Sequence, residues 1–206
     1  MTLGIPPVPP ALPRRGNALS HWLCRRMLGA IGWRIDGAAP NVPKLVAIVA
    51  PHTSAWDFPV GVVGMFAFGV RVTFLAKDAL FRWPLGPMIR WLGGIPVDRE
   101  NPSGLVERTI AEFNRRNRMV LALAPEGTRK KVVRWRTGFY HMAVGARVPI
   151  VPIAFDWPTR TIRIGPPIVP TGRLQDDMQT IAAFYAGVRG KRPELATLPS
   201  KEFDLK

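Results

Sequence analysis

Short, mainly apolar runs recur along the chain and predict its strands. The clearest is Leu45 to Ala50, which reads LVAIVA and is rich in β-branched residues. Such a run is typical of a central strand that is covered on both faces, as in a parallel sheet. The other strand candidates are Val72 to Ala76, Gly94 to Val97, Met119 to Ala124, Val148 to Phe155 and Arg160 to Ile164.

Segments with helical periodicity lie between these runs. Apolar residues recur at three- and four-residue steps from Leu105 to Phe113, where Ser103 could cap the helix, and again from Leu174 to Val188. Further helices are expected at Phe58 to Val70, at Ala79 to Leu92 with breaks at Pro84 and Pro87, and at Gly138 to Arg147. The alternation predicts an α/β fold, a single domain whose largely parallel central sheet is flanked by helices.

An amphipathic helix is expected before this domain, between Asn17 and Ile35. Its apolar residues are Leu19, Trp22, Leu23, Met27, Ala30 and Ile31. Arginines and tryptophans in this segment suit a membrane interface, and packing of the helix on the domain is an equally compatible interpretation. The expected organisation is a flexible proline-rich tail over residues 1–16, the helix within residues 17–38, the α/β domain over residues 39–192 and a C-terminal tail over residues 193–206.

Length and charge limit the functions to be considered. The 206 residues are 47% hydrophobic, enough for one substantial core. The net charge of +15, from 29 basic and 14 acidic residues, implies an anionic partner: nucleic acid, a membrane rich in acidic lipids, or acidic soluble molecules. The apolar segment Phe58 to Val70 falls short of the roughly 18 to 20 residues of a spanning helix, so membrane attachment is expected to be peripheral. The single cysteine, Cys24, excludes an intramolecular disulfide and favours a reducing compartment.

The best catalytic candidates are His52 and Asp57, which follow the first apolar run. In one continuous helix, residues five apart point about 140° away from each other and could not touch. If His52 lies in a turn and Asp57 in the first turn of the next helix, the carboxylate can reach one imidazole nitrogen. The other nitrogen is then free to take a proton from a hydroxyl. The competing interpretation is structural: Asp57 caps the helix, alone or in a capping box with Ser54, and His52 is a hydrogen-bonded turn residue.

Polar residues follow four of the predicted strands at their carboxyl ends. They are His52, Lys77, Arg99 and Glu126. These ends share one edge of a parallel sheet, where ligands of open α/β domains usually bind, so the four side chains are expected to converge. Any strand needs a polar terminator, but a histidine, two basic residues and an acid at four ends favour a site.

Four blocks in this region resemble the motif blocks of the glycerolipid acyltransferases, in the same order and at similar spacing. They are His52-x-x-x-x-Asp57, Gly94-Ile95-Pro96-Val97-Asp98-Arg99, Pro125-Glu126-Gly127-Thr128-Arg129 and Val148-Pro149-Ile150-Val151-Pro152-Ile153. The region is most similar to the 1-acylglycerol-3-phosphate (lysophosphatidic acid) acyltransferases. Four ordered blocks are far more specific than one.

The resemblance implies transfer of a fatty acyl group from an acyl-CoA or acyl-carrier-protein thioester to the hydroxyl of a lysophospholipid, with 1-acylglycerol-3-phosphate expected first, in phospholipid synthesis. It implies that His52 is the general base and that Asp57 orients it. The residues expected to bind the substrates are Ser54, Lys77, Arg99, Glu126, Gly127, Thr128 and Arg129. Of these, Arg99, Thr128 and Arg129 would hold the acceptor phosphate, while a surface arginine paired with Asp98 or Glu100 is the alternative for Arg99.

The reaction sets few further requirements. A thioester is already activated, so one base, an oxyanion stabiliser and good positioning could suffice, and neither a metal nor a tightly bound cofactor is expected. The protein is expected at the cytoplasmic face of a membrane, bound peripherally to an anionic surface. Acyl carrier protein is a further candidate partner.

The chain departs from the family pattern on the acceptor side. Pro51 stands where the family often has Asn, and Ala124 replaces the usual aromatic residue. Other lysophospholipids and amino-acid lyso-lipids therefore stay open as acceptors. The alternative of another class is a non-catalytic basic protein that binds membranes or nucleic acid; nucleic acid is not expected, because the arginines are spread along the chain and no binding module stands out.

Overall fold

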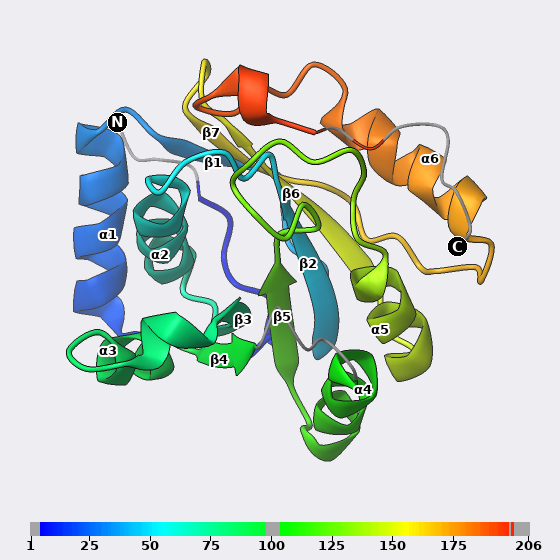
Figure 1. Ribbon diagram of the computed structural model, residues 1–206. Coiled ribbons are helices and arrows are strands. Elements are labelled where there is room, and N and C mark those ends of the chain that lie inside the picture. The colour runs from blue at the N-terminus through cyan, green and yellow to red at the C-terminus, as the bar shows by residue number, and fades with distance from the viewer. Residues whose placement is uncertain (1–4, 98–103, 198, 200–206) are drawn as a thin grey trace.

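A seven-stranded sheet forms the centre of the part that the computed structural model describes, residues 5–97, 104–197 and 199 (Figure 1). The strands are β1 (Arg34–Asp36), β2 (Lys44–Ala50), β3 (Val72–Lys77), β4 (Gly94–Val97), β5 (Met119–Leu123), β6 (Ile150–Asp156) and β7 (Thr161–Ile164). They lie in the order β1-β7-β6-β2-β5-β3-β4. Every neighbouring pair is parallel except β6 and β7. The predicted α/β fold with a largely parallel sheet is confirmed.

Helices cover both faces of this sheet (Figure 1). They are α1 (Ala18–Ala30), α2 (Asp57–Phe68), α3 (Gly86–Leu92), α4 (Leu105–Arg115), α5 (Gly138–Ala146) and α6 (Leu174–Tyr185), with short 3-10 helices at η1 (Asp78–Phe81) and η2 (Pro193–Leu195). On one face, Leu28 of α1 and Phe68 of α2 pack with Phe155 and Ile162 of the sheet. The other face is covered by α4, α5 and α6, through Phe113, Phe139, Met142, Met178, Ile181 and Tyr185.

The strand β2 lies in the middle of the sheet, as its unbroken apolar sequence predicts. Val46 and Ile48 belong to the core under α4, α5 and α6, whereas Leu45 and Ala47 belong to a second buried cluster. None of the four is more than 3% exposed. Successive side chains of a strand point to opposite faces, so this short run contributes to the hydrophobic core on both sides of the sheet.

The proline-rich N-terminal segment packs against the sheet. The flexible tail expected over residues 1–16 is therefore wrong for residues 5–16. Leu12 is 1% exposed and lies in the buried cluster of β2 and β5. Arg118 donates from Nη1 to the carbonyl of Pro10 at 2.9 Å and to that of Leu12 at 3.4 Å. Proline lacks an N–H but keeps its carbonyl, so a proline-rich segment can still be held by donors of the domain.

The first helix is shorter than predicted, and an unexpected strand follows it. The helix α1 ends at Ala30, and the chain then turns at Gly32, which has a φ of 74°. A positive φ is easily reached only by glycine, so the turn is encoded at this position. Trp33 and Ile35 point inward at 3% and 9% exposure, and β1 pairs with β7 at the edge of the sheet.

The other boundaries are close to the predicted ones. The helix α4 begins after Gly104, and the suggested cap Ser103 lies outside the described residues. Pro84 lies between η1 and α3, so the break predicted there is confirmed. The break predicted at Pro87 is wrong, because Pro87 lies in the first turn of α3, where a missing N–H is tolerated. The strand β7 runs antiparallel to β6 because only four residues connect the two strands, too few for a crossover.

Candidate active site

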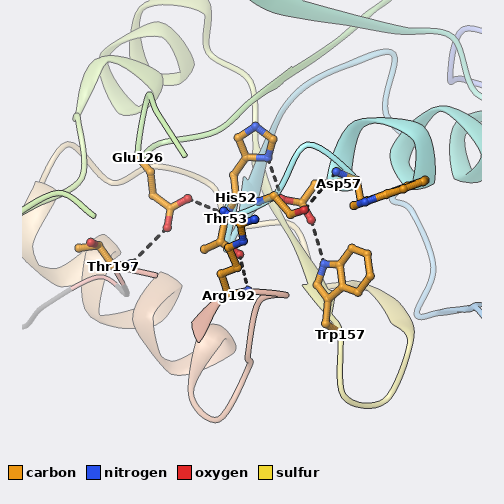
Figure 2. A network of polar contacts seen from close by, with 9 residues as sticks. His52, Thr53, Asp57, Glu126, Trp157, Arg192 and Thr197 are labelled. Atoms are coloured by element: carbon orange, nitrogen blue, oxygen red, sulfur yellow. Dashed lines mark hydrogen bonds and ion pairs between the residues drawn. The ribbon is translucent and has the colours of Figure 1, made fainter. Parts of the chain in front are cut away.

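His52 and Asp57 are in contact at the carboxyl end of β2 (Figure 2). His52 lies in the turn after the strand, and Asp57 is the first residue of α2. Nδ1 of His52 is 3.2 Å from Oδ2 of Asp57, and the two side chains are 28% and 1% exposed. The predicted contact is confirmed. It forms because the chain changes from turn to helix between the two residues, whereas a continuous helix would hold them apart.

Both carboxylate oxygens of Asp57 are held from the protein side. Oδ1 accepts a hydrogen bond from the indole N–H of Trp157 at 2.8 Å, and Oδ2 accepts one from the backbone N–H of Ser54 at 2.9 Å. Trp56 occupies the N-cap position of α2, so Asp57 is not the cap itself. The carboxylate thus closes the turn and faces His52 at the same time, and the structural and catalytic interpretations are compatible.

The side chain of Ser54 belongs to the turn. Ser54 is 7% exposed, and its hydroxyl accepts a hydrogen bond from the backbone N–H of Trp56 at 3.2 Å. Ser54 therefore orders the turn that carries the His52–Asp57 pair, and its expected contact with substrate stays a prediction.

The contact with Asp57 determines which nitrogen of His52 can accept a proton. A carboxylate opposite Nδ1 favours the tautomer that carries its proton on Nδ1. Nε2 is then the basic nitrogen, and Figure 2 shows the second ring nitrogen pointing away from Asp57. The pair can therefore act as a general base with an oriented imidazole.

Glu126 holds the backbone of His52 in place through a hydrogen bond. It follows β5, the neighbour of β2, and is 3% exposed. Oε2 accepts a hydrogen bond from the backbone N–H of His52 at 2.6 Å, and Oε1 accepts one from the backbone N–H of Thr197 at 3.2 Å (Figure 2). Burial raises the pKa of Glu126 above its ordinary value, and the two backbone hydrogen bonds oppose that shift. Glu126 lies beside the site as predicted, but as a support under the histidine.

Thr197 ties the end of the chain to the loop after β5. Its hydroxyl donates to the carbonyl of Val132 at 2.6 Å and accepts from the N–H of Val132 at 3.2 Å. Its carbonyl accepts a hydrogen bond from the indole of Trp135 at 2.6 Å. The expected tail over residues 193–206 is thus wrong for residues 193–197, which complete the support of Glu126.

The segment before Thr197 packs on the other side of the turn that holds His52 and Asp57. The backbone N–H of Arg192 donates to the hydroxyl of Thr53 at 3.2 Å. Nζ of Lys191 lies 4.7 Å from the ring centroid of Trp157 and 5.0 Å from that of Trp56. A cation over two indoles helps to hold Trp157, the donor to Asp57, in place.

The other predicted site residues that the structure describes lie along the same edge of the sheet. The strands β2, β5, β3 and β4 are neighbours and all parallel, so their carboxyl ends are adjacent. Lys77 is the exposed last residue of β3, and Arg129 is exposed in the loop after β5. Gly127 has a φ of 67°, and the hydroxyl of Thr128 accepts from the N–H of Lys130 at 3.3 Å. Arg99 lies outside the described residues.

Gly127 also provides space for a neighbouring arginine. A Cβ at this position would come within 3.1 Å of Nε of Arg136. The side chain of Arg136 therefore lies directly against Gly127. Among the described residues, no group of three His, Cys, Asp or Glu side chains is arranged to hold a metal ion.

A family model described as Acyltransferase matches residues 39–156, more than half of the chain. The chain belongs to the acyltransferase family. The matched segment of this acyltransferase begins before β2 and ends with β6, so it contains the turn with His52 and Asp57, Glu126 and the four motif blocks.

Several related proteins carry one name, 1-acyl-sn-glycerol-3-phosphate acyltransferase. The protein of Haemophilus influenzae is 23% identical over 87% of this chain and 82% of its own length. The protein of Cocos nucifera is 28% identical over 78% of this chain, and that of Streptococcus pneumoniae is 29% identical over 69%. The chain spans 55% and 56% of the lengths of these last two relatives.

The fold also has a counterpart among solved structures. The 1-acyl-sn-glycerophosphate (LPA) acyltransferase PlsC of Thermotoga maritima superposes with a TM-score of 0.58 at 18% identity. The similarity covers 82% of this chain and 77% of that protein. At this identity the similarity shows that the fold is shared.

Two residues that support the site were missed in the sequence, and both lie outside the segment matched to the acyltransferase family. Trp157 directly follows β6 and donates its indole N–H to Asp57. Polar groups at the carboxyl ends of parallel strands are site candidates. Trp157 would have been one of them if its indole N–H had been counted as a polar group. Thr197 lies in a short polar stretch without periodicity. No local signal in the sequence points to it.

Proposed function

We propose that this acyltransferase moves a fatty acyl group from an acyl-CoA or acyl-carrier-protein thioester to the hydroxyl of a lysophospholipid, with 1-acylglycerol-3-phosphate as the acceptor. The observation that carries the proposal is the contact of 3.2 Å between His52 and a buried, fully hydrogen-bonded Asp57. The shared name of the relatives supports the choice of acceptor.

The proposed reaction uses His52 as a proton carrier. Nε2 takes the proton of the acceptor hydroxyl while the hydroxyl oxygen forms a bond to the thioester carbonyl carbon. The tetrahedral intermediate collapses, the carbon–sulfur bond breaks, and the thiolate takes the proton from His52. The products are an ester and a free thiol. Asp57 stabilises the transient imidazolium and keeps the ring in one orientation.

The acceptor phosphate requires cations near this base. We assign it to Arg99 and Arg129, with Thr128 as an additional donor and Lys77 at the rim. Guanidinium groups can form two parallel hydrogen bonds to phosphate oxygens. The exposed position of Arg129 next to the Glu126 block supports this assignment.

We further propose that the protein binds peripherally to an anionic membrane at the cytoplasmic face. In the described part of the chain, no helix has the length and apolar character to cross a bilayer. Large apolar side chains are nevertheless exposed on α1 and around α3: Leu19, Trp22, Leu23, Met27, Trp83, Leu85, Met88 and Trp91. Figure 1 shows α1 and α3 on the same side of the molecule. An apolar surface with tryptophans, on a protein of net charge +15, fits an acidic lipid interface.

Thiol release by the purified protein tests the reaction. Lysophosphatidic acid is supplied with acyl-CoA in one series and with acyl carrier protein thioester in another, and other lyso-lipids, including amino-acid lyso-lipids, replace the acceptor in parallel reactions. Acceptor-dependent thiol release with lysophosphatidic acid is expected. Faster turnover of another lyso-lipid would change the acceptor and keep the reaction. A folded protein that releases no thiol with any acceptor would contradict the proposal.

A further inference from the structure

A basic cavity lies at the end of the sheet opposite the catalytic turn. Its volume is about 480 Å³. The lining residues are Pro13, Arg71, Thr73, Arg115, Arg116, Arg118, Met119 and Val120. The floor is formed by the amino ends of β3 and β5, at the lower end of β5 in Figure 1. Volumes of this order are typical of small-molecule sites.

The positive charge of the cavity is only partly neutralised. Half of the eight lining residues are arginines, and none is acidic. The adjacent Glu112 accepts hydrogen bonds from Arg115, at 2.8 and 3.0 Å, and from Arg116. Partial burial opposes ionisation of Glu112, but these hydrogen bonds hold its pKa below the ordinary value, so it stays charged. One carboxylate cannot neutralise two guanidinium groups and leaves Arg71 and Arg118 uncompensated.

Arg71 is the cation that is most available to a ligand. Its backbone N–H holds the carbonyl of Pro13 at 2.8 Å, which does not involve the side chain. Arg118, by contrast, uses Nη1 to hold the N-terminal segment. Within the described residues, no hydrogen bond is made by the guanidinium of Arg71, and it is exposed.

We propose that this cavity binds a phosphate group with two or more negative charges. Several guanidinium groups around one cavity match the oxygens of a phosphate better than those of a monovalent anion, because each fork can form paired hydrogen bonds. The strand β3 runs from Val72 at the cavity to Lys77 at the catalytic edge, a distance of roughly 17 Å for six residues. A phosphate bound here is therefore distinct from the phosphate of a reacting acceptor, and its binding does not depend on acyl transfer.

The cavity adjoins the exposed aromatic surface around α3. Arg15 is close enough to Arg71 for the positive charge to lower the pKa of Arg15, in addition to the larger effect of burial. The guanidinium of Arg15 lies 4.5 Å from the ring centroid of Trp91 and donates to the Trp91 carbonyl at 2.6 Å. The phosphate could belong to a lipid headgroup or to a soluble compound. A cavity next to an exposed aromatic surface can be reached by either of them.

Calorimetric titration of the full chain with inorganic pyrophosphate at physiological ionic strength tests the soluble source. Arg71→Gln is expected to weaken binding at least roughly tenfold, since a charge-assisted hydrogen bond is lost. Arg173→Gln is the matched control, because it removes the same charge at an exposed residue that directly precedes α6 and pairs with Asp176. If Arg71→Gln melts at a lower temperature than the wild type without ligand, its weaker binding could reflect lost stability. Arg115→Gln, which removes a lining arginine of α4, is then titrated in its place.

Vesicle sedimentation tests the lipid source with the same variants. Phosphatidic acid, a phosphomonoester, is compared with phosphatidylglycerol, a phosphodiester, at equal surface charge in phosphatidylcholine. A specific loss of phosphatidic acid binding in Arg71→Gln, with pyrophosphate too weak to measure, assigns the site to a headgroup. A loss of pyrophosphate binding alone assigns it to a soluble ligand. Equal effects of Arg71→Gln and Arg173→Gln in both assays, or no effect in either, would overturn the proposal.

Discussion

Trp157 donates its indole N–H to Oδ1 of Asp57 at 2.8 Å, from a position 100 residues further along the chain. The other oxygen of the same carboxylate lies 3.2 Å from Nδ1 of His52. Because each oxygen has its own partner, the carboxylate cannot rotate without breaking a hydrogen bond. Trp157 is therefore a positioning residue for the proposed base, which acts through Asp57.

Trp157→Phe tests this relationship, since phenylalanine keeps an aromatic ring and lacks the N–H. We expect kcat to fall about tenfold, as one buried hydrogen bond is lost, with little change in either KM. Trp33→Phe is the matched control, because Trp33 packs edge-on against Trp157 with ring centroids 5.1 Å apart and is not among the described hydrogen-bond donors to Asp57. Equal losses of kcat in the two variants would mean that only packing matters.

His52→Ala is expected to abolish acyl transfer and to leave folding and vesicle binding intact. The loss of a general base typically costs a factor of about 10² to 10⁴. Asp57→Asn should also be severely impaired, and it should melt at a lower temperature because Asp57 closes the turn through Ser54. Undiminished acceptor-dependent thiol release by folded His52→Ala protein would refute the mechanism.

Glu126 makes stability depend on pH in a defined direction. Burial raises its folded pKa above the ordinary value of 4.5, so folding favours the protonated carboxyl. This contribution is complete below the unfolded pKa and is lost as pH rises through the folded pKa. We expect the melting temperature of the wild type, relative to Glu126→Gln, to fall as pH rises above about 4.5. A difference that stays constant between acidic and neutral pH would show that Glu126 does not titrate in this way.

Arg99 is expected to act mainly on acceptor binding. Arg99→Ala should raise the KM for lysophosphatidic acid by an amount equivalent to roughly 1.5 to 3 kcal/mol, and the KM for the thioester should change little. Arg129, in the loop after β5, is assigned to the same phosphate, so Arg129→Ala should also raise the KM for lysophosphatidic acid. An acceptor without phosphate is the control: if the wild type and Arg99→Ala differ by the same factor on both acceptors, Arg99 does not bind phosphate.

Membrane binding should have a salt-sensitive and a salt-resistant part. Basic residues near an acidic leaflet contribute about 1 kcal/mol each and are screened by salt, whereas apolar insertion is not. We expect high salt to release most of the protein from anionic vesicles, and Trp22→Ala to reduce the fraction that resists salt. Val169→Ala, an exposed apolar residue outside α1 and α3, should leave that fraction unchanged. Tight binding to DNA without binding to vesicles at the same salt would favour a nucleic-acid-binding protein instead.

The sequence alone determined the features that depend on neighbouring residues. The run from Leu45 to Ala50 is apolar at every position, so its alternating side chains predict a strand that is buried on both faces. His52 and Asp57 are only five positions apart, so a turn followed by a helix was enough to predict their contact. The parallel order of the apolar runs likewise predicted that Glu126 would lie beside them.

The tertiary structure decided which polar groups hold this pair in place. The hydrogen bonds of His52 to Glu126, of Asp57 to Trp157 and of Glu126 to Thr197 join residues 74, 100 and 71 positions apart. Hydrophobic periodicity reports which side chains are buried, and it carries no information about which buried donor will find which acceptor. The pairing of donors with acceptors is decided only when the sheet and the segments that cover it pack together, because each buried polar group must then find a hydrogen-bond partner nearby. For the same reason, the packed ends of the chain at residues 5–16 and 193–197 could not be read from their composition.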